Sequence, residues 1–175
     1  LPSETPARLE PVTDGLDFQP GDEILISSME HMAGIAATSL LAKRRGVVVK
    51  EVPIGLPPRS VDELVGAFEA AITPRTKLIL ISHTVYISGL IAPVKELSEM
   101  AHRHGVLVLA DSAHGPGMLD LNLHALGVDF FAASPYKWLG APCGVGIFYV
   151  KRDVQDRLWP TIAMSGWDTQ PDARR

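Results

Sequence analysis

The sequence predicts an α/β fold in which helices cover both faces of a mostly parallel sheet, so that the domain has three layers in the order α, β, α. Short runs rich in β-branched residues alternate along the chain with longer segments of helical periodicity. This alternation is typical of βα units stacked into a parallel sheet. The runs 77–82 and 106–110 are almost continuously apolar, as expected for strands that are covered on both faces.

Start and stop signals place the elements in order. Ser60 and Glu63 form a capping box, in which the two side chains satisfy free amide groups at a helix start, and Gly46 and Gly105 are normal helix ends. Strands are expected at residues 23–27, 47–53, 77–82, 106–110, 129–133 and 145–150. Helices are expected at about 30–45, 60–72 and 93–104, with a short turn at 121–126 and a final helix capped by Asp153.

The chain divides into three parts. Prolines at positions 2, 6, 11 and 20 predict that residues 1–21 are an irregular lead-in with at most a short helical piece. Residues 22–160 hold the alternating pattern and form the core. Residues 161–175 are expected to be a tail leading towards a missing small C-terminal domain, with 170–175 disordered or cut off.

Composition excludes several classes of function. The net charge is −4, the pI is near 5.8, and the basic residues are scattered, which disfavours nucleic acid as a partner. The single cysteine, Cys143, cannot form an internal disulfide, and no Cys/His spacing suggests a metal site. Neither a signal peptide nor an apolar run of membrane-spanning length occurs, so we expect a soluble, cytoplasmic protein.

Polar segments follow four of the expected strands. They are Ser27–His31, Ser82–Tyr86, Asp111–His114 and Ser134–Lys137. Taken alone, each has an ordinary explanation, such as a helix cap or a solvated lysine. Because ligands of open parallel sheets bind beyond the carboxyl ends of the strands, together they predict one crevice.

Pyridoxal 5'-phosphate (PLP) chemistry requires residues of these types. A lysine amine, here Lys137, forms a Schiff base with the cofactor. A carboxylate such as Asp111 keeps the pyridine nitrogen protonated, and an imidazole such as His31 stacks on the ring and moves protons. The hydroxyls of Ser134 and Tyr136 are candidates to bind the phosphate or the phenolic oxygen.

These motifs resemble the large-domain core of the class V aminotransferase family, PLP-dependent transferase-like enzymes of fold type I that include cysteine desulfurases and isopenicillin N epimerase. The matching segments are Met29-Glu-His31, Leu109-Ala-Asp-Ser-Ala-His114 and Ser134-Pro-Tyr-Lys137. The resemblance implies that Lys137 holds PLP, that Asp111 pairs with the pyridine nitrogen, and that His31 stacks on the ring. It also implies that His114 lies near the phenolic oxygen, that Ser134 binds phosphate, and that an amino acid is the substrate of a homodimer.

The sequence also departs from the family. Tyr86 stands where the family often has Asn, so the usual contact to the phenolic oxygen is replaced by a hydroxyl or lost, and Tyr136 stands where His is common. Members of the family are about twice as long.

The alternative hypothesis is therefore a truncated, catalytically incompetent PLP-fold core with a structural or assembly role. A Rossmann-like nucleotide binder is weaker, because residues 140–146 lack the Gly-x-Gly-x-x-Gly spacing.

Overall fold

The computed structural model describes residues 6–162 and residue 165. In this part of the chain, six strands form one sheet in the order β2-β1-β3-β4-β5-β6. The first five are parallel and β6 pairs antiparallel with β5. The strands are β1 (Glu23–Ser27), β2 (Val48–Val52), β3 (Thr76–Ser82), β4 (Leu107–Asp111), β5 (Phe130–Ala133) and β6 (Ile147–Val150).

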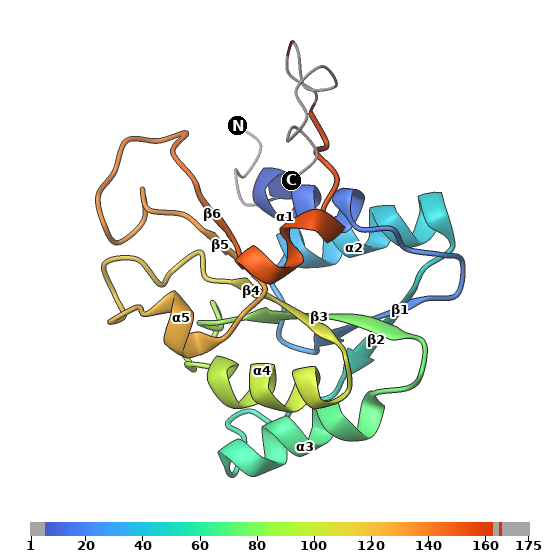
Figure 1. The fold of residues 1–175 in the computed structure, drawn as a ribbon. Coiled ribbons are helices and arrows are strands. Elements are labelled where there is room, and N and C mark those ends of the chain that lie inside the picture. Colours follow the sequence, from blue (N-terminus) through green and yellow to red (C-terminus); the bar gives the residue numbers. More distant parts are fainter. Residues whose placement is uncertain (1–5, 163–164, 166–175) are drawn as a thin grey trace.

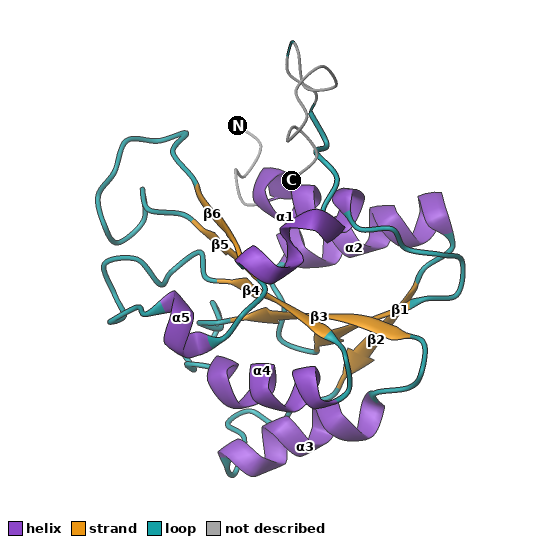
Figure 2. Cartoon of the chain, viewed as in Figure 1, coloured by secondary structure: helices purple, strands orange, loops and turns teal. Residues whose placement is uncertain are grey.

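Helices cover both faces of this sheet. They are α1 (Pro6–Gly15), α2 (Met32–Arg45), α3 (Val61–Ala71), α4 (Val94–Arg103) and the short α5 (Leu123–Leu126), followed by the 3₁₀ helix η1 (Arg152–Arg157). Figures 1 and 2 show α1 and α2 on one face and α3 and α4 on the other. The predicted three-layer α/β architecture with a mostly parallel sheet is therefore confirmed.

Two apolar cores lie on the two faces of the sheet. Along β3, Leu78 and Leu80 pack into the core beneath α1 and α2. Ile79 and Ile81 point the other way, into the core with Phe68 of α3. All five side chains are at most 1% exposed, and burying one such side chain stabilises the fold by about 1.5–3 kcal/mol. Both faces are covered, which explains why β3 is apolar without alternation.

The N-terminal segment differs from the prediction. Residues 6–15 form a full helix, although the prolines predicted an irregular lead-in over 1–21. Leu9 and Val12 of this helix are completely buried and join the core of α2 and the sheet. Pro11 lies inside the helix and removes one backbone donor. The burial of the apolar stripe outweighs that loss, which the proline pattern alone could not reveal.

Two helix starts also differ from the prediction. Helix α2 begins at Met32 with His31 as its N-cap, whereas Glu30 was the expected start. The last helix is a 3₁₀ helix that follows Lys151 and has no side-chain cap, so the cap predicted at Asp153 is wrong. The predicted tail, residues 161–175, lies outside the described residues except for 161, 162 and 165.

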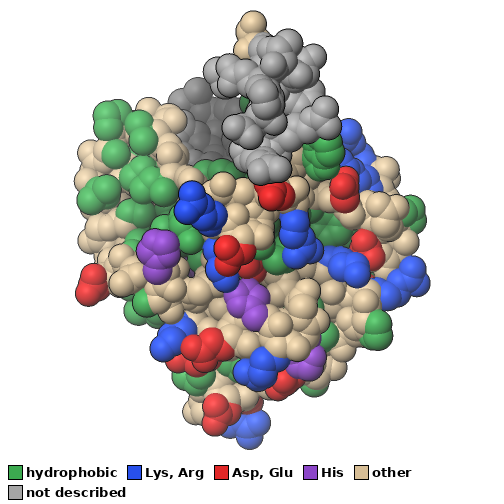
Figure 3. All heavy atoms as spheres, viewed as in Figure 1, with side chains coloured by type: hydrophobic (Ala, Val, Ile, Leu, Met, Phe, Trp, Pro, Cys, Tyr) green, Lys and Arg blue, Asp and Glu red, His purple; other side chains and the backbone are tan. Residues whose placement is uncertain are grey.

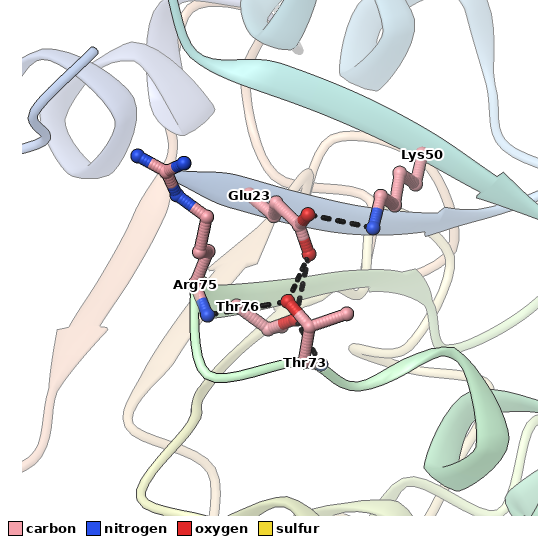
Figure 4. Close-up of polar contacts among 5 residues, drawn as sticks. All are labelled: Glu23, Lys50, Thr73, Arg75 and Thr76. Atoms are coloured by element: carbon pink, nitrogen blue, oxygen red, sulfur yellow. Dashed lines mark hydrogen bonds and ion pairs between the residues drawn. The ribbon is translucent and has the colours of Figure 1, made fainter. Parts of the chain in front are cut away.

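A buried polar cluster closes the amino end of the sheet (Figure 4). Glu23 opens β1, and its carboxylate accepts hydrogen bonds from Thr73 Oγ1 at 2.6 Å and Thr76 Oγ1 at 3.2 Å. Lys50 Nζ of β2 lies 2.6 Å from the same carboxylate. The Glu23 side chain is 9% exposed. These contacts bind β1 to its neighbours β2 and β3, at the end of the sheet opposite the four predicted strand-end segments.

Acidic and basic side chains are mixed over the face shown in Figure 3. Hydrophobic side chains gather instead over the loop between β5 and β6, where Trp138, Leu139 and Val145 are 60%, 59% and 43% exposed. None of the helices in the described part of the chain is long and apolar enough to span a bilayer.

Candidate functional site

The carboxyl ends of four neighbouring strands enclose a small polar hollow. Its lining comes from the segments after β1, β3, β4 and β5: His31, Ser82, Thr84, Tyr86, Asp111, Ala113, His114 and Lys137. The free space between these side chains is about 10 Å³, enough for roughly one water molecule. A ring-sized ligand therefore requires long side chains such as Lys137 to rotate away.

His31 is fixed by its place at the start of α2. As N-cap it has an extended backbone, and its Nδ1 accepts a hydrogen bond from the amide of Ala33 at 3.1 Å. A neutral imidazole has one acceptor nitrogen, so the proton of neutral His31 lies on Nε2. The Tyr86 and His31 rings are packed edge to face, with a centroid distance of 4.9 Å and an angle of 85° between their planes. The imidazole is therefore held by its backbone on one side and by an aromatic ring on the other.

A buried carboxylate lies directly behind His31. Glu30 is 5% exposed and accepts hydrogen bonds from Ser27 Oγ at 2.6 Å and from the backbone N and Oγ of Ser82 at 3.0 and 2.6 Å. It thus ties the end of β1 to the end of β3. Burial raises the pKa of Glu30, the bonds from Ser27 and Ser82 oppose this, and the nearby charge of Asp111 adds to the increase. Its environment disfavours the ionised form.

The segment after β3 turns back on itself. Thr84 forms an antiparallel bridge with Ile91, and the amide of His83 donates to the carbonyl of Asp111 at 2.8 Å. His83 is buried, its Nδ1 lies 3.1 Å from Ser112 Oγ, and burial lowers its pKa. These contacts bind the β3 segment to the β4 segment, so Thr84 and Asp111 are held at fixed positions.

Asp111 ends β4 and is 4% exposed. Its Cα pairs in register with Ser82 of β3, and its Oδ1 accepts a hydrogen bond from the amide of Ala113 at 3.1 Å. A buried carboxylate at the edge of the sheet is well placed to bind a cationic group of a ligand, because that charge compensates for the water it has lost.

Lys137 and His114 meet from different strands. Lys137 Nζ lies 3.3 Å from His114 Nε2, and the indole Nε1 of Trp138 donates to His114 Nδ1 at 3.0 Å. Burial lowers the pKa of His114, and the charges of Lys137 and His31 lower it further. His114 is therefore uncharged at neutral pH, with a lysine amine on one ring nitrogen and an indole on the other.

The structure brings five of the predicted site residues together around the hollow: His31, Tyr86, Asp111, His114 and Lys137. Ser134 and Tyr136 do not line it, although both lie on the segment that carries Lys137. Ser134 is 1% exposed, and its carbonyl accepts a hydrogen bond from the amide of Lys137 at 3.0 Å. Ser134 thus shapes the turn that holds the lysine.

Sequence reasoning assigned no role to Glu30, His83 or Thr84. All three stand in the strand-end segments, but their importance comes from burial. Thr84 is 7% exposed, and its Oγ1 is a buried polar atom without a hydrogen-bond partner among the described residues. A buried hydroxyl of this kind at the wall of a hollow fits a ligand that carries its own polar atoms.

The residues around the hollow fit PLP by their chemistry. A lysine amine, a buried carboxylate, a neutral imidazole and the unsatisfied hydroxyl of Thr84 converge at one sheet edge. Among the described residues there is no group of three or more His, Cys, Asp or Glu side chains that could hold a metal ion. The fold and this donor set define the class of PLP-dependent enzymes of fold type I.

A family comparison makes the assignment specific. The model of the aminotransferase class-V family matches residues 5–171, so the chain belongs to this family. The predicted family is therefore confirmed. The cofactor of the family is pyridoxal phosphate, and a similar solved structure is a mutant of C-DES with glycine covalently linked to its PLP cofactor.

Individual relatives come from two branches. Isopenicillin N epimerase of Amycolatopsis lactamdurans is 40% identical over 153 residues, which are 87% of this chain and 38% of that protein. A probable cysteine desulfurase of Halalkalibacterium halodurans is 36% identical over 80% of this chain and 34% of its own length. The complex of the cystine C–S lyase C-DES with cysteine persulfide has a TM-score of 0.85 and 30% identity, covering 91% of this chain and 42% of that one. The chain thus spans less than half the length of these relatives.

Proposed function

We propose that this chain is the cofactor-binding core of a PLP-dependent enzyme that acts on an amino acid, with Lys137 as the lysine that holds the cofactor. The observation that carries the proposal is the meeting of the Lys137 amine with neutral His114 at 3.3 Å, in a hollow that also contains buried Asp111. Relatives from two branches of the family support the same chemistry.

The roles of the other residues rest on the resemblance of their motifs to those of the family and, for the residues that line the hollow, also on their surroundings. Asp111, a buried carboxylate, pairs with the protonated pyridine nitrogen. His31 covers one face of the ring, since its Nδ1 is fixed by the amide of Ala33. His114 and Tyr86 line the edge that carries the phenolic oxygen, and Ser134 and Tyr136 bind phosphate from the turn before Lys137.

Bound PLP supplies an electron sink that weakens the Cα–H bond of an amino acid. The chain's own contribution is to move a proton. Lys137, once it is an uncharged amine, accepts the proton from the substrate Cα and returns it. Epimerisation, desulfuration, β-elimination and transamination all begin with proton removal of this kind. We therefore place the protein among epimerases, lyases and aminotransferases of its family.

The test is an absorbance spectrum of the purified chain mixed with PLP. We expect a band near the visible edge that Lys137→Ala abolishes. Borohydride reduces the C=N bond, so on wild type it should remove this band and leave the cofactor irreversibly attached to Lys137. Lys95→Ala is the matched control, because Lys95 is an exposed lysine on α4 that does not line the hollow, and its loss should change nothing. Identical spectra for wild type and Lys137→Ala would refute the assignment of the lysine.

A catalytically incompetent core with a structural or assembly role is the second candidate. Its support is the contracted hollow of about 10 Å³. The two candidates predict different results in a screen of amino acids for turnover by the PLP-treated chain. Turnover that depends on Lys137 supports the enzyme, whereas cofactor uptake without turnover supports the incompetent core.

We propose in addition that the protein is a cytoplasmic homodimer. Large apolar side chains are exposed on the segments that carry the lining residues or flank them: Met32, Tyr86, Ile87, Ile91, Met118, Trp138 and Leu139. Large exposed apolar surface is typical of an interface. Sedimentation velocity over a range of concentrations is the test, and a species that stays monomeric throughout would contradict the dimer.

A further inference from the structure

His114 lies between two nitrogen atoms that both can donate hydrogen bonds. The indole Nε1 of Trp138 is 3.0 Å from Nδ1, and the amine of Lys137 is 3.3 Å from Nε2. An indole N–H can only donate. Neutral imidazole has a single acceptor nitrogen, and Trp138 occupies it, so the proton of His114 lies on Nε2.

This proton faces the lysine. A charged Lys137 has only N–H donors, and it gains nothing from an N–H of His114. An uncharged Lys137 has a lone pair that accepts the Nε2–H of His114. The contact therefore favours the uncharged amine over the ammonium ion. An uncharged amine is the form that attacks a carbonyl carbon and that accepts a proton.

The indole is held beside His114 by the backbone. Gly117 has a φ of +83°, and a Cβ atom there would lie 2.7 Å from the Trp138 carbonyl carbon and 2.7 Å from the Leu139 nitrogen. The loop after β4 thus packs backbone to backbone on the segment after Lys137. Trp138 is 60% exposed. The close approach nevertheless fixes the position of its backbone relative to the loop that carries His114.

We propose that Trp138 is a positioning residue that holds His114 in the Nε2–H tautomer and thereby favours the uncharged form of Lys137. The inference deepens the proposed function, on which it rests, because it assigns a residue that prepares the cofactor lysine. Trp138 itself need not touch cofactor or substrate. It acts through the imidazole.

Other charged or titratable groups around the hollow also act on Lys137. They are Asp111, His31 and Tyr86 on the lining, with Glu30 behind His31. The carboxylate of Asp111 favours the ammonium form of Lys137, whereas burial disfavours the ionised form of Glu30. All of them remain when Trp138 is replaced by Phe, so the difference between the two proteins isolates the indole N–H.

The experiment compares wild type with Trp138→Phe, which keeps an aromatic ring and removes the donor. Trp159→Phe is the matched control: the Trp159 indole is also exposed and donates to Asp17 Oδ2 at 3.3 Å, away from the lysine. Competitive labelling with acetic anhydride across pH, followed by mass spectrometry of the Lys137 peptide, measures the pKa of this amine in the cofactor-free chain. Circular dichroism confirms that each variant is folded.

We expect Trp138→Phe to raise the pKa of Lys137, because freed Nδ1 takes the proton and Nε2 becomes an acceptor for the ammonium ion. The uncharged fraction at neutral pH should fall about fivefold, the effect of one ordinary hydrogen bond. Histidine side-chain ¹⁵N spectra should show His114 changing from the Nε2–H to the Nδ1–H tautomer. Trp159→Phe should match wild type in both measurements.

The outcomes separate this inference from the proposed function. An unchanged pKa of Lys137 in Trp138→Phe, or an unchanged tautomer of His114, overturns the role of Trp138 even if the wild-type chain takes up PLP. A raised pKa with the tautomer change supports it. Trp138→Phe can also change both the pKa of Lys137 and the tautomer of His114 while the wild-type chain shows no PLP uptake that depends on Lys137. In that case the proposed function fails and the positioning role of Trp138 stands.

Discussion

Replacing Glu23 by Gln is expected to loosen the amino end of the sheet. The carboxylate of Glu23 has three close partners, Lys50 Nζ at 2.6 Å, Thr73 Oγ1 at 2.6 Å and Thr76 Oγ1 at 3.2 Å. They come from β2, from the turn before β3 and from β3 itself. Gln keeps the shape and one acceptor oxygen but loses the charge. Its NH₂ group is a donor, so it cannot accept the hydrogen bonds that the second carboxylate oxygen accepts in wild type.

The size of the effect follows from these contacts. A hydrogen bond to a charged group contributes about 1.5–3 kcal/mol. Lys50 is 39% exposed, so water replaces much of its lost partner, and a solvent-screened ion pair contributes about 1 kcal/mol or less. One threonine keeps an acceptor. We therefore expect Glu23→Gln to lower the free energy of unfolding by about 2 kcal/mol at pH 7, out of a total of about 5–15 kcal/mol for a domain.

The effect depends on pH with a definite sign. The hydrogen bond with Lys50, followed by that with Thr73, lowers the pKa of Glu23 from 4.5. A lowered pKa in the folded state gives stability that is present above the unfolded pKa and is lost as pH falls through the folded value. The difference between wild type and Glu23→Gln should therefore be constant near neutral pH and close below about pH 4.

Urea unfolding followed by circular dichroism between pH 3 and 7 measures this difference. Glu51→Gln is the control, because Glu51 lies on the neighbouring strand β2 with an exposed side chain, and its replacement should cost almost nothing. A difference of the same size at pH 3 and pH 7 would show that shape, not charge, carries the effect. No loss at pH 7 would refute the reasoning altogether.

Two further predictions concern the site. Burial raises the pKa of Glu30, so wild type loses stability as pH rises through the pKa of the folded state. In urea unfolding, Glu30→Gln should therefore become more stable relative to wild type between pH 4 and pH 8. The opposite trend would contradict this. Gly117→Ala should lower the unfolding free energy by about 1–3 kcal/mol and raise the pKa of Lys137, whereas Gly66→Ala, with no neighbour within 4 Å, should be neutral or stabilising. Equal effects of the two would refute the close approach.

Much of the site was predictable because of one geometric rule. Polar residues after parallel strands meet at one edge. From this rule His31, Asp111 and Lys137 were expected to share one crevice, and all three line the hollow, while their roles remain proposals. The fold class followed from the alternation of apolar runs and helical segments. Helix α1 did not follow, since the pattern Pro6 to Gly15 shows two prolines and hides the buried stripe that packs on α2.

Burial and side-chain direction were not predictable from the sequence. Glu30 stood in a quoted motif, but its importance depends on hydrogen bonds to Ser27 and Ser82, which come together only when β1 and β3 pair. Trp138 looked like an ordinary neighbour of the lysine. Its role depends on the hydrogen bond from the indole N–H to His114, which a particular rotamer makes possible. A single sequence contains no signal for that contact.

Strand β1 has a glutamate near each end, and their environments differ in sign. Glu23, at the amino end, meets a cation and two hydroxyls, and its pKa is lowered, with the Lys50 hydrogen bond as the largest cause. Glu30, just after the carboxyl end, meets only neutral donors, and burial raises its pKa. An ionised group with its own counter-charge stabilises a fold, whereas an acid whose ionisation is opposed by burial costs stability, as is common at functional sites. The raised pKa belongs to Glu30, beside Ser82 and the other residues that line the hollow, and this agrees with the proposal that the chemistry takes place at the carboxyl end of the sheet.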